Sequence, residues 1–216
     1  MRRMSMSLGV ERLDEIGERI AQMMELKVPD GLVAKLSLLP RLLELGKFPP
    51  RMKGGSPPCQ EVVLRGDEVD LRKLPIIKCW PEDGGPYITL PMVISRDPKR
   101  GIRNVGMYRV QLLGARDLAM HWQRHKVGAA HWRDMAERKE TMPVCIAIGA
   151  DPPSMYSASA PLPPTVDEFL FAGFLRRAPV RLAKAVTNDL EVPAESEFET
   201  AGGSTVKELF ADAAAG

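Results

Sequence analysis

Four short polar segments of the sequence hold residue types that could do chemistry, and the first runs from Arg103 to Arg109. The segment lies in a run that is typical of a β-strand. Successive side chains of a strand face opposite sides, so Asn104 and Arg109 could serve one site only if the backbone bends or bulges. Gly106 is where it could do so. The alternative is a half-exposed strand with solvated arginines.

The second segment contains all three histidines of the chain, His121, His125 and His131. A neutral imidazole is a common metal ligand, and the basic residues of this segment could attract a phosphate. The other interpretation is a polar surface segment without a ligand. The sequence leaves both interpretations open.

The third segment pairs Thr165 with Glu168, and the fourth is the run Trp80–Gly85. A threonine N-cap with a glutamate three residues later, directly before an apolar run, is typical of a capping box. A carboxylate at a helix start can also be a ligand for a hard metal ion, together with an asparagine oxygen and a histidine. Two acids before a glycine pair, as in Trp80–Gly85, are typical of a solvated turn.

The rest of the sequence excludes several classes of protein. It lacks G-x-G-x-x-G, Walker A, G-x-S-x-G and H-E-x-x-H motifs. Its three cysteines lie too far apart for a disulfide framework or a zinc site. A net charge of +2 over 216 residues gives no basic patch for nucleic acid. No apolar run approaches the ~18–20 residues that span a bilayer, and no signal peptide follows Met1. We therefore expect a soluble, cytoplasmic protein.

The elements that must position these segments are short strands and a few helices. Apolar spacing of three and four predicts helices over 8–26 and 31–45, and a proline-rich stretch over 47–58 follows. Such a mixture favours an α+β fold with an antiparallel sheet or a partly open barrel. The other predicted elements are strands over 61–64, 74–80, 88–96, 102–113 and 142–149, helices over 129–140 and 165–177, and a loose tail from Glu199 with a short helix over 206–211.

Six stretches, taken together and in order, resemble the UbiD-type decarboxylases, which are carboxy-lyases that use prenylated FMN. The resemblance covers roughly residues 10–198. The matching stretches are 74–85, 103–111, 120–123 with 125–126, 148–153, 168–169 with 172–173, and 188–194.

The resemblance implies a metal and a cofactor site. In the family an asparagine, a histidine and a glutamate hold a divalent ion, usually manganese, which ties down the flavin phosphate; potassium is a further candidate ion. Metal and base would offset the phosphate charge, and the planar fork of Arg109 would face the substrate carboxylate as the catalytic residue. The implied metal ligands are Asn104, His121 and Glu168, and the implied cofactor-binding residues are Met107, Tyr108, Arg109, His121, Trp122, Gln123 and Lys126.

The resemblance also implies the domain organisation. Residues 1–58 would be a helical N-terminal segment with a proline-rich linker, 59–198 a split β-barrel domain that binds prenylated FMN, and 199–216 an Ala/Gly-rich tail. Family members are longer, with a C-terminal domain that carries the acidic proton donor and much of the dimer contact. No position of this sequence matches that donor.

The expected activity is the non-oxidative decarboxylation of aromatic or α,β-unsaturated carboxylic acids, with the 4-hydroxybenzoate type of quinone biosynthesis as a candidate. The expected partners are the small-molecule acid, a flavin prenyltransferase that supplies the cofactor, and a second copy of the full-length protein, but no nucleic acid or membrane. Two alternatives stay open. One is a catalytically incomplete flavin- and metal-binding fragment, and the other is an α+β fragment that does not fold well alone.

Overall fold

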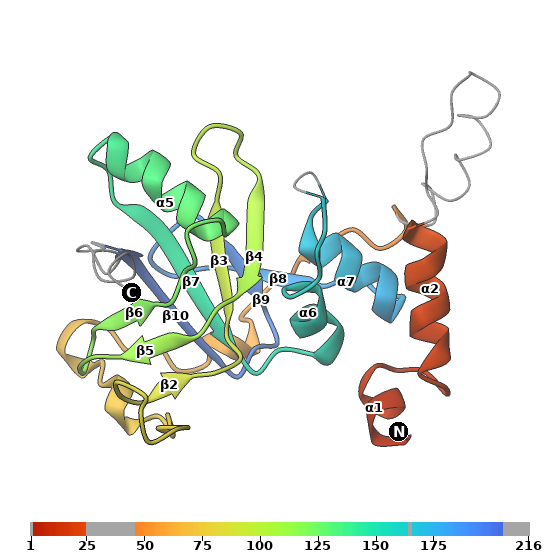
Figure 1. The fold of residues 1–216 in the computed structure, drawn as a ribbon, viewed down its shortest axis with the longest axis horizontal. Helices are drawn as coiled ribbons and strands as arrows, with labels where there is room; N and C mark the ends of the chain where they lie inside the picture. The colour runs from red at the N-terminus through yellow and green to blue at the C-terminus, as the bar shows by residue number, and fades with distance from the viewer. Residues whose placement is uncertain (1, 25–45, 164–165, 205–216) are drawn as a thin grey trace.

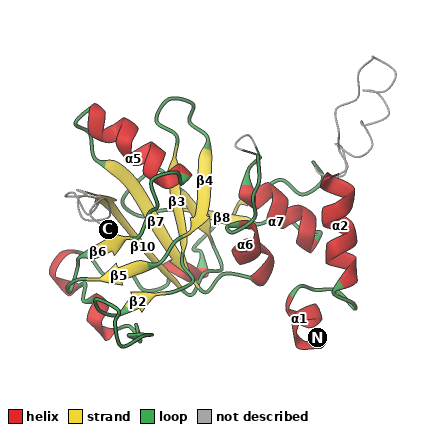
Figure 2. Ribbon diagram, viewed as in Figure 1, coloured by secondary structure: helices red, strands yellow, loops and turns green. Residues whose placement is uncertain are grey.

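The fold is built on three small β-sheets with helices beside them (Figures 1 and 2). The computed structural model describes residues 2–24, 46–163 and 166–204. The largest sheet has the strand order β10-β7-β3-β4, and all its neighbouring strands are antiparallel. Its strands are β3 (Met92–Arg96), β4 (Arg103–Met107), β7 (Met142–Ile148) and β10 (Phe198–Ser204).

Two three-stranded sheets lie beside the central one. One has the order β2-β5-β6, and the other has the order β1-β8-β9 with a parallel β1–β8 pair. Their strands are β2 (Tyr87–Ile88), β5 (Val110–Leu112), β6 (Leu118–Met120), β1 (Arg51–Met52), β8 (Arg181–Lys184) and β9 (Glu191–Pro193). The helices are α1 (Arg2–Ser7), α2 (Asp14–Met24), α5 (Val127–Glu137), α6 (Pro152–Ser157) and α7 (Glu168–Arg176), with short 3-10 turns at Pro58–Gln60, Gly66–Glu68 and Leu71–Lys73.

The central sheet buries apolar side chains on both faces. Its side chains alternate, so Ile94 and Val105 pack on one side with Phe169 of α7, while Val93 packs on the other with Trp122. Ile94 and Phe169 are fully buried. The core therefore fixes the position of α7 against β4.

A smaller apolar cluster joins α2 to α7, which Figure 1 shows side by side. It contains Ile16 of α2 with Phe171 and Leu175 of α7. Within the described part of the chain, no helix is long and apolar enough to cross a membrane.

The expectation of a split barrel is not confirmed. Among the described residues, the strands form separate sheets and none of these sheets closes on itself. The run 102–113 was predicted as one strand, but it divides after Met107, so that β4 belongs to the central sheet and β5 to a neighbouring one. A mixed α/β fold with open sheets is what the chain forms.

The tail predicted from Glu199 is wrong in its first part. Residues Phe198–Ser204 form β10, which pairs with β7 from Ile148 to Met142. Two glycines and an alanine give this strand a weak intrinsic signal, so pairing with β7 rather than propensity decides its structure. The strands predicted over 61–64 and 74–80 are absent, and Ile77 forms only an isolated bridge to Tyr87.

The bounds of two predicted helices differ from those in the structure. The helix expected over 8–26 begins only at Asp14, and α5 begins at Val127 and ends at Glu137 rather than covering 129–140. The strand predicted over 142–149 is confirmed as β7. The helices predicted over 31–45 and 206–211 lie outside the described residues.

Gly173 of α7 is where the backbone before β1 lies closest to the helix. A Cβ atom at this position would overlap the carbonyl oxygen of Phe48, and a backbone group gives way less readily than a flexible side chain. We expect Gly173→Ala to lower the free energy of unfolding by about 1–3 kcal/mol, measured by urea denaturation. Gly17→Ala in α2 is the control, because its Cβ would meet open space and alanine should stabilise the helix by about 0.5–1 kcal/mol. Equal stability of Gly173→Ala and wild type would contradict this contact.

Candidate cofactor and metal site

The open edge of β4 is where α7 and α6 approach the central sheet. β4 pairs with β3 on one side, so its outward N–H groups need other partners. The N–H of Met107 donates to the carbonyl oxygen of Ala158 at 3.0 Å, and the N–H of Val105 donates to the Glu168 carboxylate. The first residue of α7 is therefore bound directly to β4.

Asp167 caps this helix. Its Oδ1 accepts hydrogen bonds from the N–H groups of Phe169 at 2.8 Å and Leu170 at 3.0 Å. The predicted capping box is wrong, because α7 begins at Glu168 and Asp167 already fills the capping role. Thr165 lies outside the described residues. The Glu168 carboxyl is thus free for the contact with β4.

The Glu168 carboxyl lies in a setting that disfavours its charge. Burial raises its pKa to about 7, and the neighbouring charge of Asp167 adds to this effect, while the Val105 N–H and Arg103 oppose it. Its Oε2 is buried and has no hydrogen-bond partner among the described residues. A buried carboxylate oxygen needs a proton, a donor or a cation, and the described residues provide Oε2 with no donor.

Tyr108 lies close to both Asn104 and Glu168. Its ring folds back over Gly106, where a Cβ atom would overlap it. Burial, with a smaller contribution from the charge of Glu168, raises the pKa of its hydroxyl, while the nearby Asn104 side chain and Gly128 N–H oppose this effect. Tyr108 is therefore close to polar groups of β4, α5 and α7.

Three buried polar atoms around Tyr108 have no hydrogen-bond partner among the described residues. They are Asn104 Nδ2, Trp122 Nε1 and Glu168 Oε2. The Trp122 ring meets the Tyr108 ring edge-on with centroids 6.1 Å apart, and its Nε1 lies beside Gly128. Buried polar groups are normally satisfied, so this cluster has the character of a site for a polar or charged ligand.

His121 and Arg109 meet in a second cluster, on the β2-β5-β6 sheet. His121 Nε2 lies 3.1 Å from Tyr87 Oη and 3.3 Å from Gln111 Oε1. The Arg109 guanidinium stacks 4.0 Å over the Tyr87 ring and forms a two-point ion pair with Asp83, with its closer contact at 2.9 Å. Burial, and then the charge of Arg109, lowers the pKa of His121, which favours the neutral imidazole that a metal requires.

The two clusters are adjacent because each contains sequence neighbours of residues in the other. Tyr108 precedes Arg109, and His121 precedes Trp122; the N–H of His121 donates to the carbonyl oxygen of Arg109 at 3.0 Å. This backbone bond holds the two clusters side by side. Asn104 and Glu168 thus lie around Tyr108, while the described side-chain contacts of His121 are in the second cluster.

The other predicted site residues lie at different depths. Met107 is half-buried against the core, whereas Gln123 and Lys126 are exposed, and Lys126 is the N-cap residue of α5. His131 is buried and hydrogen-bonds to Ser95 at 3.1 Å, so it has no part in either cluster. Among the described residues, no three His, Cys, Asp or Glu side chains form a metal-binding group; the predicted set includes an asparagine.

Sequence reasoning missed Asp83, Tyr87 and Gln111. The run Trp80–Gly85 was interpreted as a solvated turn, but the Asp83 side chain is only 12% exposed and is the ion-pair partner of Arg109. That pair also lowers the pKa of Asp83. The tight Gly84-Gly85 step beside Gln111 was the available signal, since it brings the turn back onto the sheet.

Comparison with known proteins decides the family. Residues 51–209 match the family model described as "UbiD: 3-octaprenyl-4-hydroxybenzoate carboxy-lyase Rift-related domain". The chain belongs to the UbiD family. The resemblance seen in the sequence is thereby confirmed.

Two curated relatives match nearly the whole chain. A protein from Aquifex aeolicus is 45% identical over 212 residues, which are 98% of this chain and 43% of the relative. A protein from Archaeoglobus fulgidus is 44% identical over 209 residues, which are 96% of this chain and 42% of the relative. Both are described as uncharacterized. The chain thus spans about two fifths of the length of these relatives.

Solved UbiD-class structures share the fold. HmfF from Pelotomaculum thermopropionicum, in complex with FMN, is 26% identical with a TM-score of 0.75, over 93% of this chain and 40% of that one. Apo 3,4-dihydroxybenzoic acid decarboxylase from Klebsiella pneumoniae is 25% identical with a TM-score of 0.66, over 79% and 37%. Vanillic acid decarboxylase from Sedimentibacter hydroxybenzoicus, at 24% identity and a TM-score of 0.76 over 94% and 40%, shows the fold alone.

Proposed function

We propose that this chain provides the part of a UbiD-type carboxy-lyase that binds prenylated FMN and a divalent cation. The observation that carries the proposal is the unpartnered, buried Oε2 of Glu168 beside Asn104 and Tyr108, in a chain of the UbiD family. HmfF supports the cofactor, since it was solved with FMN and, in an evolved dimeric form, with prFMN.

Residues of the two adjacent clusters fit a divalent cation. Glu168 and Asn104 offer oxygen ligands, and His121 offers a neutral imidazole; manganese accepts all three. A cation would supply the positive charge that Glu168 Oε2 lacks, and it would offset the charge of the flavin phosphate. Trp122 Nε1 is an unused donor, and Lys126 is an exposed base that can approach a phosphate. Met107, Tyr108 and Gln123 complete the proposed cofactor-binding residues.

Arg109 is the residue we assign to the substrate carboxylate. Asp83 occupies one end of the guanidinium and Tyr87 covers one face, so the group is held in a fixed orientation while its side chain stays 38% exposed. A guanidinium fixed in this way can still donate to a carboxylate from its free edge. The bound flavin derivative supplies the electron sink for the departing CO₂, and the protein orients the acid and excludes water.

The proposed substrates are aromatic or α,β-unsaturated carboxylic acids, with a 4-hydroxybenzoate-type step of quinone biosynthesis as one candidate. A flavin prenyltransferase would supply the cofactor, a second copy would assemble with the full-length protein, and potassium is a further candidate ion. The second candidate function is cofactor and metal binding without turnover. The unpartnered, buried Glu168 Oε2 supports this function directly, because it points to a bound ligand and not to turnover.

The test is co-expression of the chain with a flavin prenyltransferase in medium containing manganese. We expect a flavin absorbance spectrum and bound manganese, and we expect Asn104→Ala and Glu168→Ala to lose about tenfold or more of both. Glu195→Ala, which removes an exposed carboxylate, is the control and should keep both. CO₂ release from a panel of aryl acids separates the two functions. Full flavin and metal occupancy in both site variants would overturn the assignment.

A further inference from the structure

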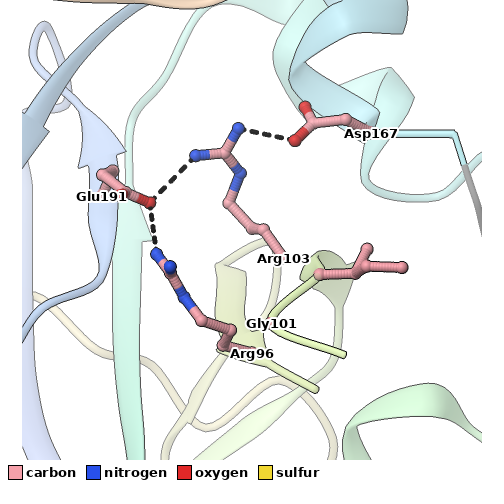
Figure 3. Close-up of a pocket in the computed structure, with 6 residues that line it drawn as sticks. Arg96, Gly101, Arg103, Asp167 and Glu191 are labelled. Atoms are coloured by element: carbon pink, nitrogen blue, oxygen red, sulfur yellow. Dashed lines mark hydrogen bonds and ion pairs between the residues drawn. The ribbon is translucent and has the colours of Figure 1, made fainter. Parts of the chain in front are cut away.

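Arg103 lies in a network of four charged side chains between β4, β9 and α7 (Figure 3). Its guanidinium donates to Asp167 Oδ2 at 2.6 Å and to Glu191 Oε2 at 3.1 Å, and Arg96 contacts the same oxygen of Glu191 at 2.7 Å. The Arg103 side chain is 11% exposed and stacks 4.9 Å over the Phe169 ring. These residues line a hollow of about 300 Å³. Arg103 is therefore held from several sides.

The two residues of the Arg103–Asp167 ion pair are sequence neighbours of two proposed metal ligands. Arg103 immediately precedes Asn104 on β4, and Asp167 immediately precedes Glu168 on α7. Because neighbouring strand residues face opposite sides, Arg103 binds α7 from the face opposite to Asn104. The ion pair thus joins the two elements one residue before each proposed metal ligand.

Asp167 uses its two oxygens for two separate tasks. Oδ1 accepts the N–H groups of Phe169 and Leu170 and so begins the helix, while Oδ2 accepts the Arg103 guanidinium. The start of α7 is therefore tied to β4 by one short side chain. Glu168, the next residue, has little freedom to move relative to the strand edge that it contacts.

We propose that the Arg103–Asp167 ion pair is a positioning device that sets the distance of Glu168 from Asn104 and thereby the affinity of the site for a divalent cation. The proposal rests on the proposed function. Arg103 and Asp167 are positioning residues, because they act through the ligands beside them.

Charge alone predicts a different outcome from positioning. Arg103 places a positive charge near a cation site, so its removal should tighten cation binding if only long-range electrostatics matter. Loss of positioning should weaken binding instead, since partners that orient metal ligands typically contribute about 10–100-fold to affinity. Arg103→Gln therefore separates the two effects by the direction of the change.

The experiment titrates Mn²⁺ alone into the 216-residue chain, with the free ion measured by electron paramagnetic resonance. We expect Arg103→Gln to weaken Mn²⁺ binding about tenfold or more. Asp167→Asn should do the same while the helix stays capped, because asparagine is an equally good N-cap residue. The double variant should bind no better than either single variant, whereas simple charge cancellation would restore wild-type affinity. Arg103→Lys, which keeps the charge with one donor group, should be intermediate.

Controls separate the two proposals. Arg96→Gln removes the outer member of the network without touching Asp167 and should leave Mn²⁺ affinity unchanged. Glu168→Gln should abolish the site; if it binds like the wild type, or if the wild type binds no Mn²⁺, the proposed function fails first. If Glu168→Gln abolishes binding but Arg103→Gln and Asp167→Asn both bind like the wild type, the positioning role is wrong. Thermal unfolding of each variant shows that it is folded. If Arg103→Gln does not fold, Arg103→Lys decides the question, because weaker Mn²⁺ binding with the positive charge retained follows only from lost positioning.

Discussion

Replacing Glu168 by glutamine is expected to stabilise the metal-free chain by about 3 kcal/mol near pH 8. Burial raises the pKa of this carboxyl to about 7, and the charged form has an unpartnered buried oxygen. A neutral amide of the same shape removes that penalty. A residue of the proposed site therefore opposes folding when the site holds no ligand.

The effect has a defined pH window. The ordinary pKa of a glutamate is 4.5, so between that value and about 7 the folded chain binds more protons at this position than the unfolded chain. The free energy of unfolding therefore falls as the pH rises through this window, and the penalty is complete above about 7. Near pH 5, the difference between Glu168→Gln and the wild type should shrink to below about 1 kcal/mol.

Urea denaturation of both proteins from pH 5 to pH 8 checks this prediction. Only the difference between the two proteins is used, so other titrating groups cancel, including His131, whose pKa burial lowers. Manganese should reverse the order, because it stabilises a wild type that can bind it and does nothing for the variant. A difference that is constant over the whole pH range would contradict the buried, charged carboxyl.

The elements that carry strong local signals could be predicted from the sequence. The strand Met142–Ile148 and the core of helix α7 follow from their apolar residues alone. β10 could not be predicted, because Ala201, Gly202 and Gly203 have little intrinsic preference for a strand and the partner strand supplies the structure. Its register depends on a neighbour more than fifty residues away.

At the candidate site, the place where 102–113 divides into two strands could not be predicted from the sequence either. The sequence indicated that the backbone must bend for Asn104 and Arg109 to serve one site, and it singled out Gly106 as the place. The break comes after Met107 instead, and Gly106 stays within β4. The glycine has a different function, since its missing side chain leaves room for the Tyr108 ring.

The sequence indicated which residues belong to the candidate site, but not which side chains pair with them or with their neighbours. The family resemblance indicated Asn104 and Glu168, and the structure places both around Tyr108; their metal role stays a prediction. Asp83 escaped notice because it reads locally as a turn residue, and Asp167 because it falls inside the helix predicted over 165–177. Their roles depend on Arg109 and Arg103, which are distant in the sequence, and an ion pair across such a distance leaves no local pattern.

Gly106→Ala should be among the most damaging single substitutions in the described chain. A Cβ atom at this position would overlap the ring and the hydroxyl of Tyr108. The ring cannot move freely, because it is buried and meets the Trp122 ring edge-on. We expect the free energy of unfolding to fall by about 3 kcal/mol, at the upper end of the usual effect of overpacking.

A control substitution distinguishes this clash from a general effect of replacing glycine. Gly54→Ala places its Cβ in open space at an ordinary backbone conformation, so it should leave the stability unchanged or slightly raised. If Gly106→Ala behaved like Gly54→Ala in urea denaturation, the close approach of Tyr108 to the strand would be refuted.

A double variant locates the origin of the loss. Tyr108→Ala alone removes a buried aromatic ring and should lower the free energy of unfolding by about 3–5 kcal/mol. Once the ring is gone, the alanine at position 106 meets no obstacle, so Gly106→Ala with Tyr108→Ala should be no less stable than Tyr108→Ala alone. Additive losses would place the clash elsewhere. Because the Tyr108 side chain lies close to both Asn104 and Glu168, the same single glycine substitution should weaken Mn²⁺ binding in any fraction that folds, which makes Gly106 a requirement of the site as well as of the fold.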